Sequence, residues 1–271
     1  MALSILNNIP SLVARNDLEI TNQNLQQTLF RLASGSRINS GADDAAGLAI
    51  ADGLQANVTA LQQSARNASD GIGSLQVADG ALAQVTSLLN RAVTLATEAA
   101  TGTVSDSQRT ALDAEFTAIK AQIDQIGQNT TFNSTSVFTA TTTTIFLSDA
   151  VANGSIGVTV GTLSSSGLGI ASDNLTTQSN AQTALTDIKS AIDQVASMRG
   201  TIGASINRLQ AVVNIINDQI QNLTAAEDGI RGADIAEEVS NLSKYTILNQ
   251  TGIAALAQAN AAQQNVLRLL Q

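Results

Sequence analysis

The side chains that could do chemistry in this chain are of few kinds. Its 271 residues include 22 Asp and Glu and 13 Lys and Arg, but no His and no Cys. Without imidazoles and thiols, most nucleophilic, general-base and soft-metal chemistry is excluded. The acids Glu98, Asp113 and Glu115 are close in sequence, but isolated carboxylates on a helical surface are normally solvated. We therefore expect no catalytic carboxylate pair, no cofactor and no enzymatic activity.

A second set of charges stands out because the region around it has few. Arg31, Arg37, Asp43 and Asp44 could form ion pairs with another copy of the chain, or they could be solvated loop charges that contribute at most about 1 kcal/mol each. Residues 1–42 have a net charge of +1 and residues 233–271 of −1, so residues 43–232 account for the net charge of −9. Near-neutral ends thus flank an acidic body, which argues against nucleic acid as a partner.

The element that organises the rest is a long apolar repeat from Leu185 to Ile230. Its apolar residues are spaced alternately by three and four, and only the positions of Arg199 and Glu227 break the series. This spacing predicts a heptad helix with one apolar seam. At 1.5 Å per residue the helix would be roughly 70 Å long, whereas a globule of this chain length is only about 50 Å across. The pattern therefore predicts a rod in which other helices cover the seam.

Similar patterns predict four further helices, at 3–34, at about 45–100, through Leu112–Ile126 and from Ile235 to the end. Short connections make consecutive helices antiparallel. Residues 130–179 are rich in Thr and Ser with short β-prone runs, which predicts a small β-hairpin tip. The expected fold is mainly α: a rod-like antiparallel coiled-coil helical bundle with that tip. We expect residues 1–42 and 233–271 to form a terminal coiled-coil domain and residues 43–232 a helical rod domain.

The first and last helices have apolar residues around most of their circumference, more than two helices can cover. Exposed apolar surface on this scale marks an interface, and a heterologous contact that does not close produces a filament. The residues predicted to form it are Leu18, Leu25, Leu29, Leu32, Leu256, Val266, Leu267, Leu269 and Leu270, with Arg31, Arg37 and Asp43. No apolar run is long enough for a membrane span, and the N-terminus lacks the features of a cleaved secretory signal.

Both ends of the chain carry specific motifs. The N-terminal ones are Leu3-Ser4-Ile5-Leu6-Asn7-Asn8, Arg31-Leu32-Ala33-Ser34-Gly35-Ser36-Arg37-Ile38-Asn39-Ser40 and Asp43-Asp44-Ala45-Ala46-Gly47-Leu48-Ala49-Ile50. The C-terminal ones are Glu238-Val239-Ser240-Asn241-Leu242-Ser243-Lys244, Leu256-Ala257-Gln258-Ala259-Asn260 and Gln264-Asn265-Val266-Leu267-Arg268-Leu269-Leu270. Together they closely resemble bacterial flagellin, in a short form that lacks the family's large outer domains.

The resemblance implies a structural subunit that polymerises into the extracellular helical filament of the bacterial flagellum, for swimming motility. It implies type III export without a cleaved signal peptide, and terminal helices that form the inner core of the filament. The implied partners are other copies of the chain, the flagellar cap, the hook-junction proteins and an export chaperone. Two other functions are weighed against it. A hook–filament junction protein would share the terminal helices, and a monomeric coiled-coil adaptor would not explain the apolar ends.

The resemblance also implies contacts with innate immune receptors. Arg91, Leu95 and Glu115 match the family's contact patch for the animal Toll-like receptor, although many recognised members have Glu at the position of Thr94. Alternatively, the three are ordinary seam and surface residues of two helices. Residues 30–51 resemble the segment that plant receptor kinases recognise, but Ala42 replaces a basic residue there.

Overall fold

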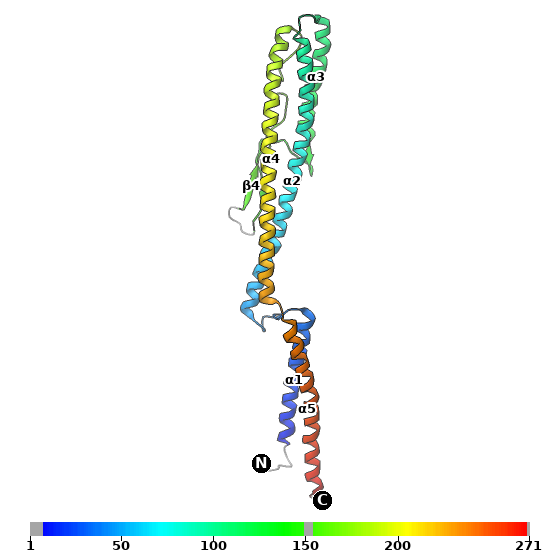
Figure 1. Ribbon diagram of the computed structural model, residues 1–271, viewed down its shortest axis with the longest axis vertical. Coiled ribbons are helices and arrows are strands. Elements are labelled where there is room, and N and C mark those ends of the chain that lie inside the picture. The colour runs from blue at the N-terminus through cyan, green and yellow to red at the C-terminus, as the bar shows by residue number, and fades with distance from the viewer. Residues whose placement is uncertain (1–7, 149–153, 270–271) are drawn as a thin grey trace. The chain divides into compact units, whose positions relative to one another are not determined.

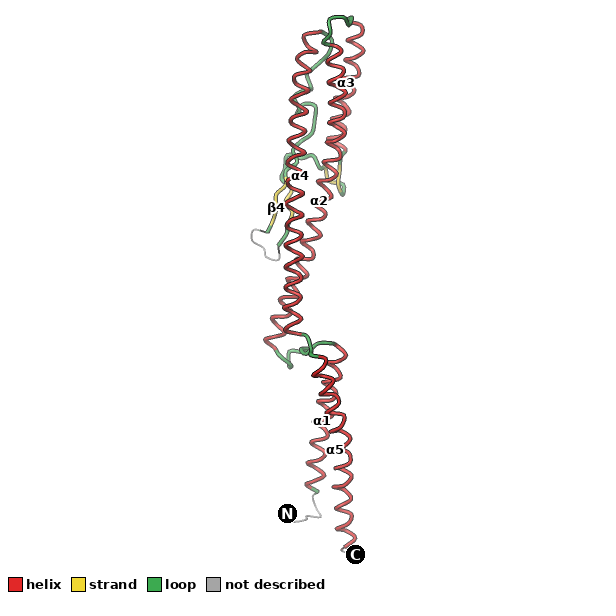
Figure 2. The backbone as a smooth tube through the Cα atoms, in the orientation of Figure 1, coloured by secondary structure: helices red, strands yellow, loops and turns green. Residues whose placement is uncertain are grey.

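The structure is a computed structural model that describes residues 8–148 and 154–269, with only the backbone described for residues 265–269. This part of the chain holds five helices and two β-hairpins (Figures 1 and 2). The helices are α1 (Ile9–Ser34), α2 (Ala45–Ala99), α3 (Asp106–Asn129), α4 (Gln178–Arg231) and α5 (Ile235–Leu269). The strands are β1 (Thr131–Phe132), β2 (Thr135–Ser136), β3 (Thr143–Phe146) and β4 (Ser155–Val158). The predicted mainly helical bundle with small hairpins is confirmed.

The chain divides into two compact units. The first comprises Met1–Ala56 and Asn222–Gln271, and the second comprises Asn57–Gln221. The first unit therefore contains α1, α5, the start of α2 and the end of α4. The second contains α3, the two hairpins and most of α2 and α4.

Local signals in the sequence set the helix ends. The Asn8 side chain accepts a hydrogen bond from the Ser11 amide at 3.1 Å and opens α1, with Pro10 in the first turn, where its missing N–H matters least. Gly35 ends α1 with a left-handed φ of 70°, a conformation that favours glycine. Ser105 and Gln108 form a capping box at the start of α3. At the start of α4 the Thr177 hydroxyl accepts from the Asn180 amide at 3.1 Å.

The core of the second unit is formed where α2, α3 and α4 pack side by side (Figure 1). On α4 one set of seam positions, spaced by seven residues, is fully buried, whereas the other set is only half-buried. The buried set is Ile188, Val195, Ile202, Leu209 and Ile216, and the half-buried set is Leu185, Ile192, Ile206, Val213 and Ile220. The neighbouring helices thus cover one side of the predicted seam more completely than the other.

Between β4 and α4 the chain runs as a long connection, here called the strap (residues 162–177). Leu163, Leu168, Ile170 and Leu175 of the strap are buried. Three polar side chains of α3 hold its backbone: Asp124 accepts from the Ser165 amide at 2.6 Å, Lys120 donates to the Asp173 carbonyl at 2.6 Å, and Asp113 accepts from the Leu175 amide at 2.7 Å. The strap therefore covers α3 where the sequence predicted only hairpins.

Both hairpins are antiparallel, and β3 pairs with β4 so that Thr143 lies opposite Val158. The β3–β4 hairpin lies along α2 rather than at the end of the helices. Ser64 of α2 donates to the Ser148 carbonyl at 3.3 Å, and Asn67 donates to the Phe146 carbonyl at 3.2 Å, far from Ala99, where α2 ends. The hairpins are therefore present as predicted, but this one is not at a tip.

Candidate assembly surface

Helices α1 and α5 form an antiparallel pair within the first unit. Neutral hydrogen bonds link them near the chain ends, from Asn8 to the Ala259 carbonyl at 3.3 Å and from Ser11 to Asn260 at 2.9 Å. Farther along, the Asn249 amide donates to the Asn22 side-chain oxygen. Polar contacts of this kind favour one register of the two helices.

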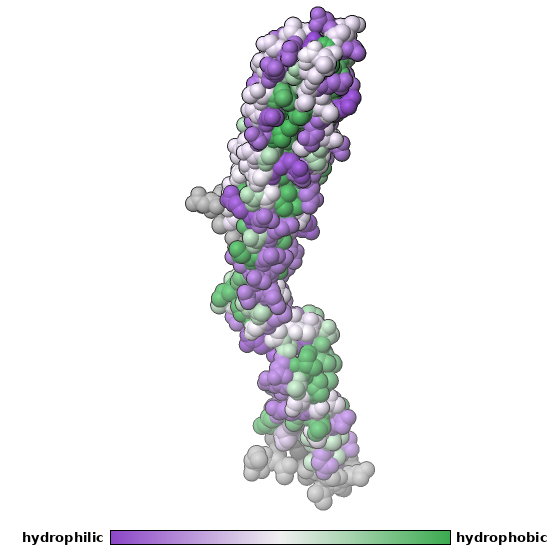
Figure 3. All heavy atoms as spheres, turned by 45° about the horizontal axis from the view of Figure 1, so that its top comes forward, coloured by the Kyte–Doolittle hydropathy of each residue, from purple (hydrophilic) through white to green (hydrophobic). Residues whose placement is uncertain are grey.

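Apolar side chains of this unit are largely left on the surface. Among the described residues of α1 and α5, the only buried side chains are Thr28 and Glu238, which are both polar. Large exposed apolar side chains of the first unit are Ile9, Leu12, Val13, Ile20, Leu29, Phe30, Ile50, Ile235, Val239, Ile247, Leu248 and Ile253, against only Val77, Phe146 and Ile215 in the described part of the second unit. Figure 3 shows apolar side chains on the surface of this unit. Such a surface is typical of a protein–protein interface.

Most of the leucines predicted to form the interface are not the side chains that are most exposed in the structure. Leu18, Leu25, Leu32 and Leu256 are half-buried, while Leu29 is exposed. Most of the exposed residues were not predicted, because the heptad spacing marks a single face of each helix and these residues lie off it. Ile9, Leu12, Val13, Ile20 and Phe30 were visible in the sequence as apolar residues outside that face. The side chains of Val266, Leu267 and Leu269, and the whole of Leu270, lie outside the described residues.

The predicted interface charges have partners within the chain. The Arg31 guanidinium lies 3.3 Å from a Glu238 carboxylate oxygen of α5 and 3.9 Å from a carboxylate oxygen of Asp43. The Arg37 guanidinium donates to the Ile230 carbonyl at 2.9 Å. Their role between subunits stays a prediction, because the same groups already tie α1, α5 and the loop after α1 together in a single chain.

Asp43 and Asp44 shape the loop that precedes α2. The Asp43 carboxylate accepts from the Asn39 amide at 3.2 Å and from both the amide and the hydroxyl of Ser40 at 3.0 Å. These hydrogen bonds lower the pKa of Asp43 and favour its charged form, and the bond from the Asn39 amide has the largest effect. Asp44 accepts from the Gly47 amide at 2.8 Å and so satisfies a free amide at the start of α2.

The three residues that match the receptor patch are placed differently from one another. Arg91 and Glu115 form a two-point ion pair between α2 and α3, with N–O distances of 2.7 and 3.0 Å, and both side chains are about half exposed. The hydrogen bond from Arg91 lowers the pKa of Glu115. Leu95 is 1% exposed and belongs to the core. The structure thus brings Arg91 and Glu115 together on the surface, while Leu95 presents no surface to a partner.

The described ranges 8–148 and 154–269 contain neither a metal-binding cluster nor a membrane-spanning helix. No group of three or more acidic side chains is placed to hold a metal ion. No helix in these ranges is both long and apolar enough to cross a membrane.

Comparisons with known proteins match nearly the whole chain. The model of the bacterial flagellin N-terminal helical region matches residues 5–143, and that of the C-terminal helical region matches residues 185–270. The flagellin of Halalkalibacterium halodurans is 35% identical over 98% of this chain and 99% of its own length. The flagellin of Bacillus subtilis is 34% identical over 99% of this chain and 100% of its own length.

Solved structures agree with this assignment. The crystal structure of Bacillus cereus flagellin is 31% identical, with a TM-score of 0.50, and covers 60% of this chain and 94% of its own. A putative flagellar hook-associated protein from Vibrio parahaemolyticus has a TM-score of 0.59 over 70% of this chain and 100% of its own, but at 13% identity the likeness shows the fold alone. The matches to flagellins over nearly the whole chain favour the filament subunit over the junction protein, and a structural role over an enzymatic one. The chain belongs to the bacterial flagellin family.

Proposed function

We propose that copies of this chain join through the α1–α5 pair, and that residues 1–42 and 233–271 form the inner core of the filament while residues 43–232 form its outer layer. That the chain is a structural subunit which polymerises into the flagellar filament follows from its family. The observation that supports this particular surface is the burial pattern. The described part of α1 and α5 buries no apolar side chain, while large apolar side chains remain exposed on both helices.

The apolar side chains exposed on the first unit can contribute binding free energy on the scale that assembly requires. Complete burial of one large aliphatic side chain contributes about 1.5–3 kcal/mol. A micromolar dissociation constant corresponds to about 8 kcal/mol of binding free energy. Because association also costs about 4–15 kcal/mol in lost translational and rotational freedom, we expect many of the exposed residues to be buried together, and not Ile9, Leu12 and Ile20 alone.

We further propose the partners and route that the family implies. The chain would leave the cell through the flagellar type III export channel without a cleaved signal, accompanied by an export chaperone, and add to the filament beneath the cap. At its base the filament would meet the hook-junction proteins. For innate receptors, the exposed Arg91–Glu115 pair is the accessible part of the patch, and Leu95 would act only by supporting α2 from within the core.

Two matched substitutions test the assembly surface. Ile20 on α1 and Ile215 on α4 are exposed to nearly the same extent, 56% and 55%. We expect Ile20→Asp to keep the helical circular dichroism signal but to raise the critical concentration for polymerisation at least tenfold, because an unpaired carboxylate would be buried between subunits. Ile215→Asp should have a much smaller effect. Equal sedimentation of both variants at the wild-type critical concentration would show that α1 is not at the joining surface.

A further inference from the structure

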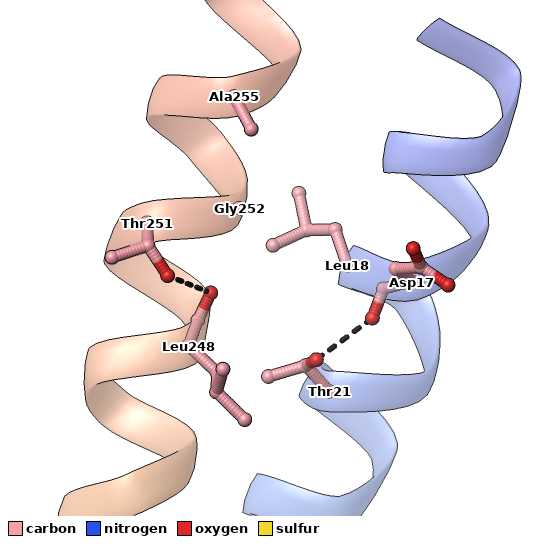
Figure 4. Close-up of a pocket in the computed structure, with 7 residues that line it drawn as sticks. All are labelled: Asp17, Leu18, Thr21, Leu248, Thr251, Gly252 and Ala255. Carbon is pink, nitrogen blue, oxygen red and sulfur yellow. Dashed lines mark hydrogen bonds between the residues drawn. The ribbon is translucent and has the colours of Figure 1, made fainter. Parts of the chain in front are cut away.

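A groove of about 260 Å³ lies between α1 and α5 inside the first unit (Figure 4). Its wall on α1 includes Leu18 and Thr21, and its wall on α5 includes Leu248, Thr251 and Gly252. Even a closed cavity of about 150 Å³ can hold a ring the size of benzene. The groove therefore has room for a branched aliphatic side chain.

The groove lining offers mainly apolar contacts, although it contains two threonines. The Thr21 hydroxyl donates to the Asp17 carbonyl at 2.7 Å, and the Thr251 hydroxyl donates to the Ile247 and Leu248 carbonyls at 3.0 and 3.1 Å. Both hydroxyls thus have partners on their own helices and do not require a polar ligand. In Figure 4 the Asp17 carboxylate points away from α5. An occupant that offers methyl and methylene groups therefore suits this site better than a polar one.

Hydrogen bonds on both sides keep the groove open. On one side Asn249 donates to Asn22, and on the other Ser11 donates to Asn260 at 2.9 Å. These bonds join α1 to α5 beyond each end of the groove and fix their separation. The space between them is therefore present in the single chain, and a ligand would not have to separate the helices. A preformed site of this kind binds with a smaller loss of conformational entropy.

Gly252 lines the groove on α5 and lets Leu18 of α1 approach that helix closely. A glycine inside a helix is less favourable than an alanine, and Gly252 has no left-handed φ that would require it. A Cβ atom at this position would lie 3.1 Å from the Leu18 Cδ1 atom, which is closer than normal packing. Any larger side chain there would displace Leu18 into the groove or fill the groove itself.

We propose that this groove receives an aliphatic side chain from the terminal helices of a second copy of the chain. The inference rests on the proposed function, because it specifies how the α1–α5 surface recognises another subunit. The same helices supply suitable side chains, since Leu12, Ile20, Ile247 and Ile253 are all exposed. The groove and the inserted side chain are different surfaces, so the contact is heterologous and can continue from copy to copy.

The groove is tested by filling it. Gly252→Leu places a branched side chain in the space, and Gly229→Leu is the matched control, because Gly229 lies in α4 of the same unit with nothing within 4 Å of an added Cβ. For the purified full-length chain, we expect Gly252→Leu to raise the critical concentration at least tenfold with an unchanged helical signal, and Gly229→Leu to polymerise normally. Only copies of the chain are present, so no other partner can occupy the groove.

A second measurement covers the case in which Gly252→Leu disturbs the helix pair. The chain has no cysteine, so Thr21→Cys and Thr117→Cys each introduce a single thiol, in the groove and on the exposed surface of α3. Maleimide should label the thiol at position 21 at least tenfold more slowly in filaments than in monomers, with a much smaller change at position 117. Equal labelling of position 21 in both states would overturn the proposal.

The outcomes also distinguish the groove proposal from the broader proposal that subunits join through the α1–α5 pair. If Ile20→Asp abolishes polymerisation but Gly252→Leu assembles like the unmodified chain, the helix pair is the joining surface and the groove is not used. If both variants assemble normally, the assembly surface itself has been assigned wrongly, and the groove proposal fails with it.

Discussion

Two irregularities in the sequence are explained by one contact between side chains. Arg199 interrupts the apolar series of α4, and Asp79 occupies a seam position of α2. In the structure Arg199 and Asp79 form a two-point ion pair with N–O distances of 2.8 and 3.2 Å. A polar pair at seam positions favours one alignment of two helices over its neighbours, because a shift by one heptad would separate the two charges.

The pair also predicts how stability depends on pH. The hydrogen bond from Arg199 lowers the pKa of Asp79 below its ordinary value of 3.8. A lowered carboxyl pKa stabilises the folded state above that value, and the stabilisation is lost as the pH falls through the folded-state pKa. Because the side chains are 38% and 40% exposed, solvent screening limits the effect to about 1 kcal/mol or less.

We therefore expect Asp79→Asn to lower the Tm by no more than about 2–4 °C at pH 7 and to have progressively less effect in acid below pH 3.8. Thermal melts of both proteins across this pH range test the expectation. Asp218→Asn, a change of the same kind at an exposed position of α4, is the control. A Tm difference that persists unchanged in strong acid would mean that the ion pair is not its cause.

At the scale of the elements, periodicity in the sequence predicted the helices well but not how completely each position is covered. The apolar positions of α4 were predicted as a single seam, yet Leu209 is fully buried and Ile206 is half-buried. Spacing identifies the face of a helix that is apolar. It does not reveal how many neighbouring elements pack on each side of that face.

The strap could not be predicted for a different reason. Its residues have no helical or strand period. Its place depends on Asp113, Lys120 and Asp124 of α3, which lie 62, 53 and 41 residues in sequence from their strap partners. Local patterns carry no information about such pairs. For the candidate surface, the sequence predicted exposed apolar helices at the chain ends. The groove at Gly252 was not predicted, because it depends on the register of α1 against α5.

The uneven coverage of α4 leads to a comparison between two adjacent seam positions. Leu209→Asp would bury a carboxylate at a side chain that is 0% exposed, which should cost several kcal/mol and could unfold the second unit. Ile206→Asp should cost much less, because its carboxylate can reach water. Chemical denaturation of the two variants measures the difference. Equal losses of stability would show that both positions are equally covered in solution.

Packing of the β3–β4 hairpin against α2 is tested with two glycines of that helix. An added Cβ at Gly71 would clash with the Ile145 side chain of β3, whereas nothing lies within 4 Å of one at Gly80. We expect Gly71→Ala to destabilise the second unit by about 1–3 kcal/mol through overpacking. Gly80→Ala should stabilise it by about 0.5–1 kcal/mol, since alanine favours the helix. Stabilisation by both would indicate that the hairpin is not seated at Gly71.

At the scale of the whole molecule, the two units differ in how they bury apolar residues. Apart from Ile38 and Ala51, all the buried apolar side chains in the described part of the chain belong to the second unit. The second unit therefore has a core of its own, whereas the first leaves most of its large apolar side chains exposed. Stable order of the terminal helices should depend on partners much more than the order of the second unit does.

Removal of the last eight residues, 264–271, tests whether assembly depends on the chain ends while the second unit folds without them. The deleted segment contains Val266, Leu267, Leu269 and Leu270, and at about 1.5–3 kcal/mol for each fully buried side chain they could supply several kcal/mol of contact between subunits. We expect the truncated chain to retain the helical melt of its second unit but not to polymerise. Circular dichroism and sedimentation, each beside the full chain, measure the two properties separately. Normal filaments would refute the assignment of these residues to the interface, and loss of the melt would show that the two units fold only together.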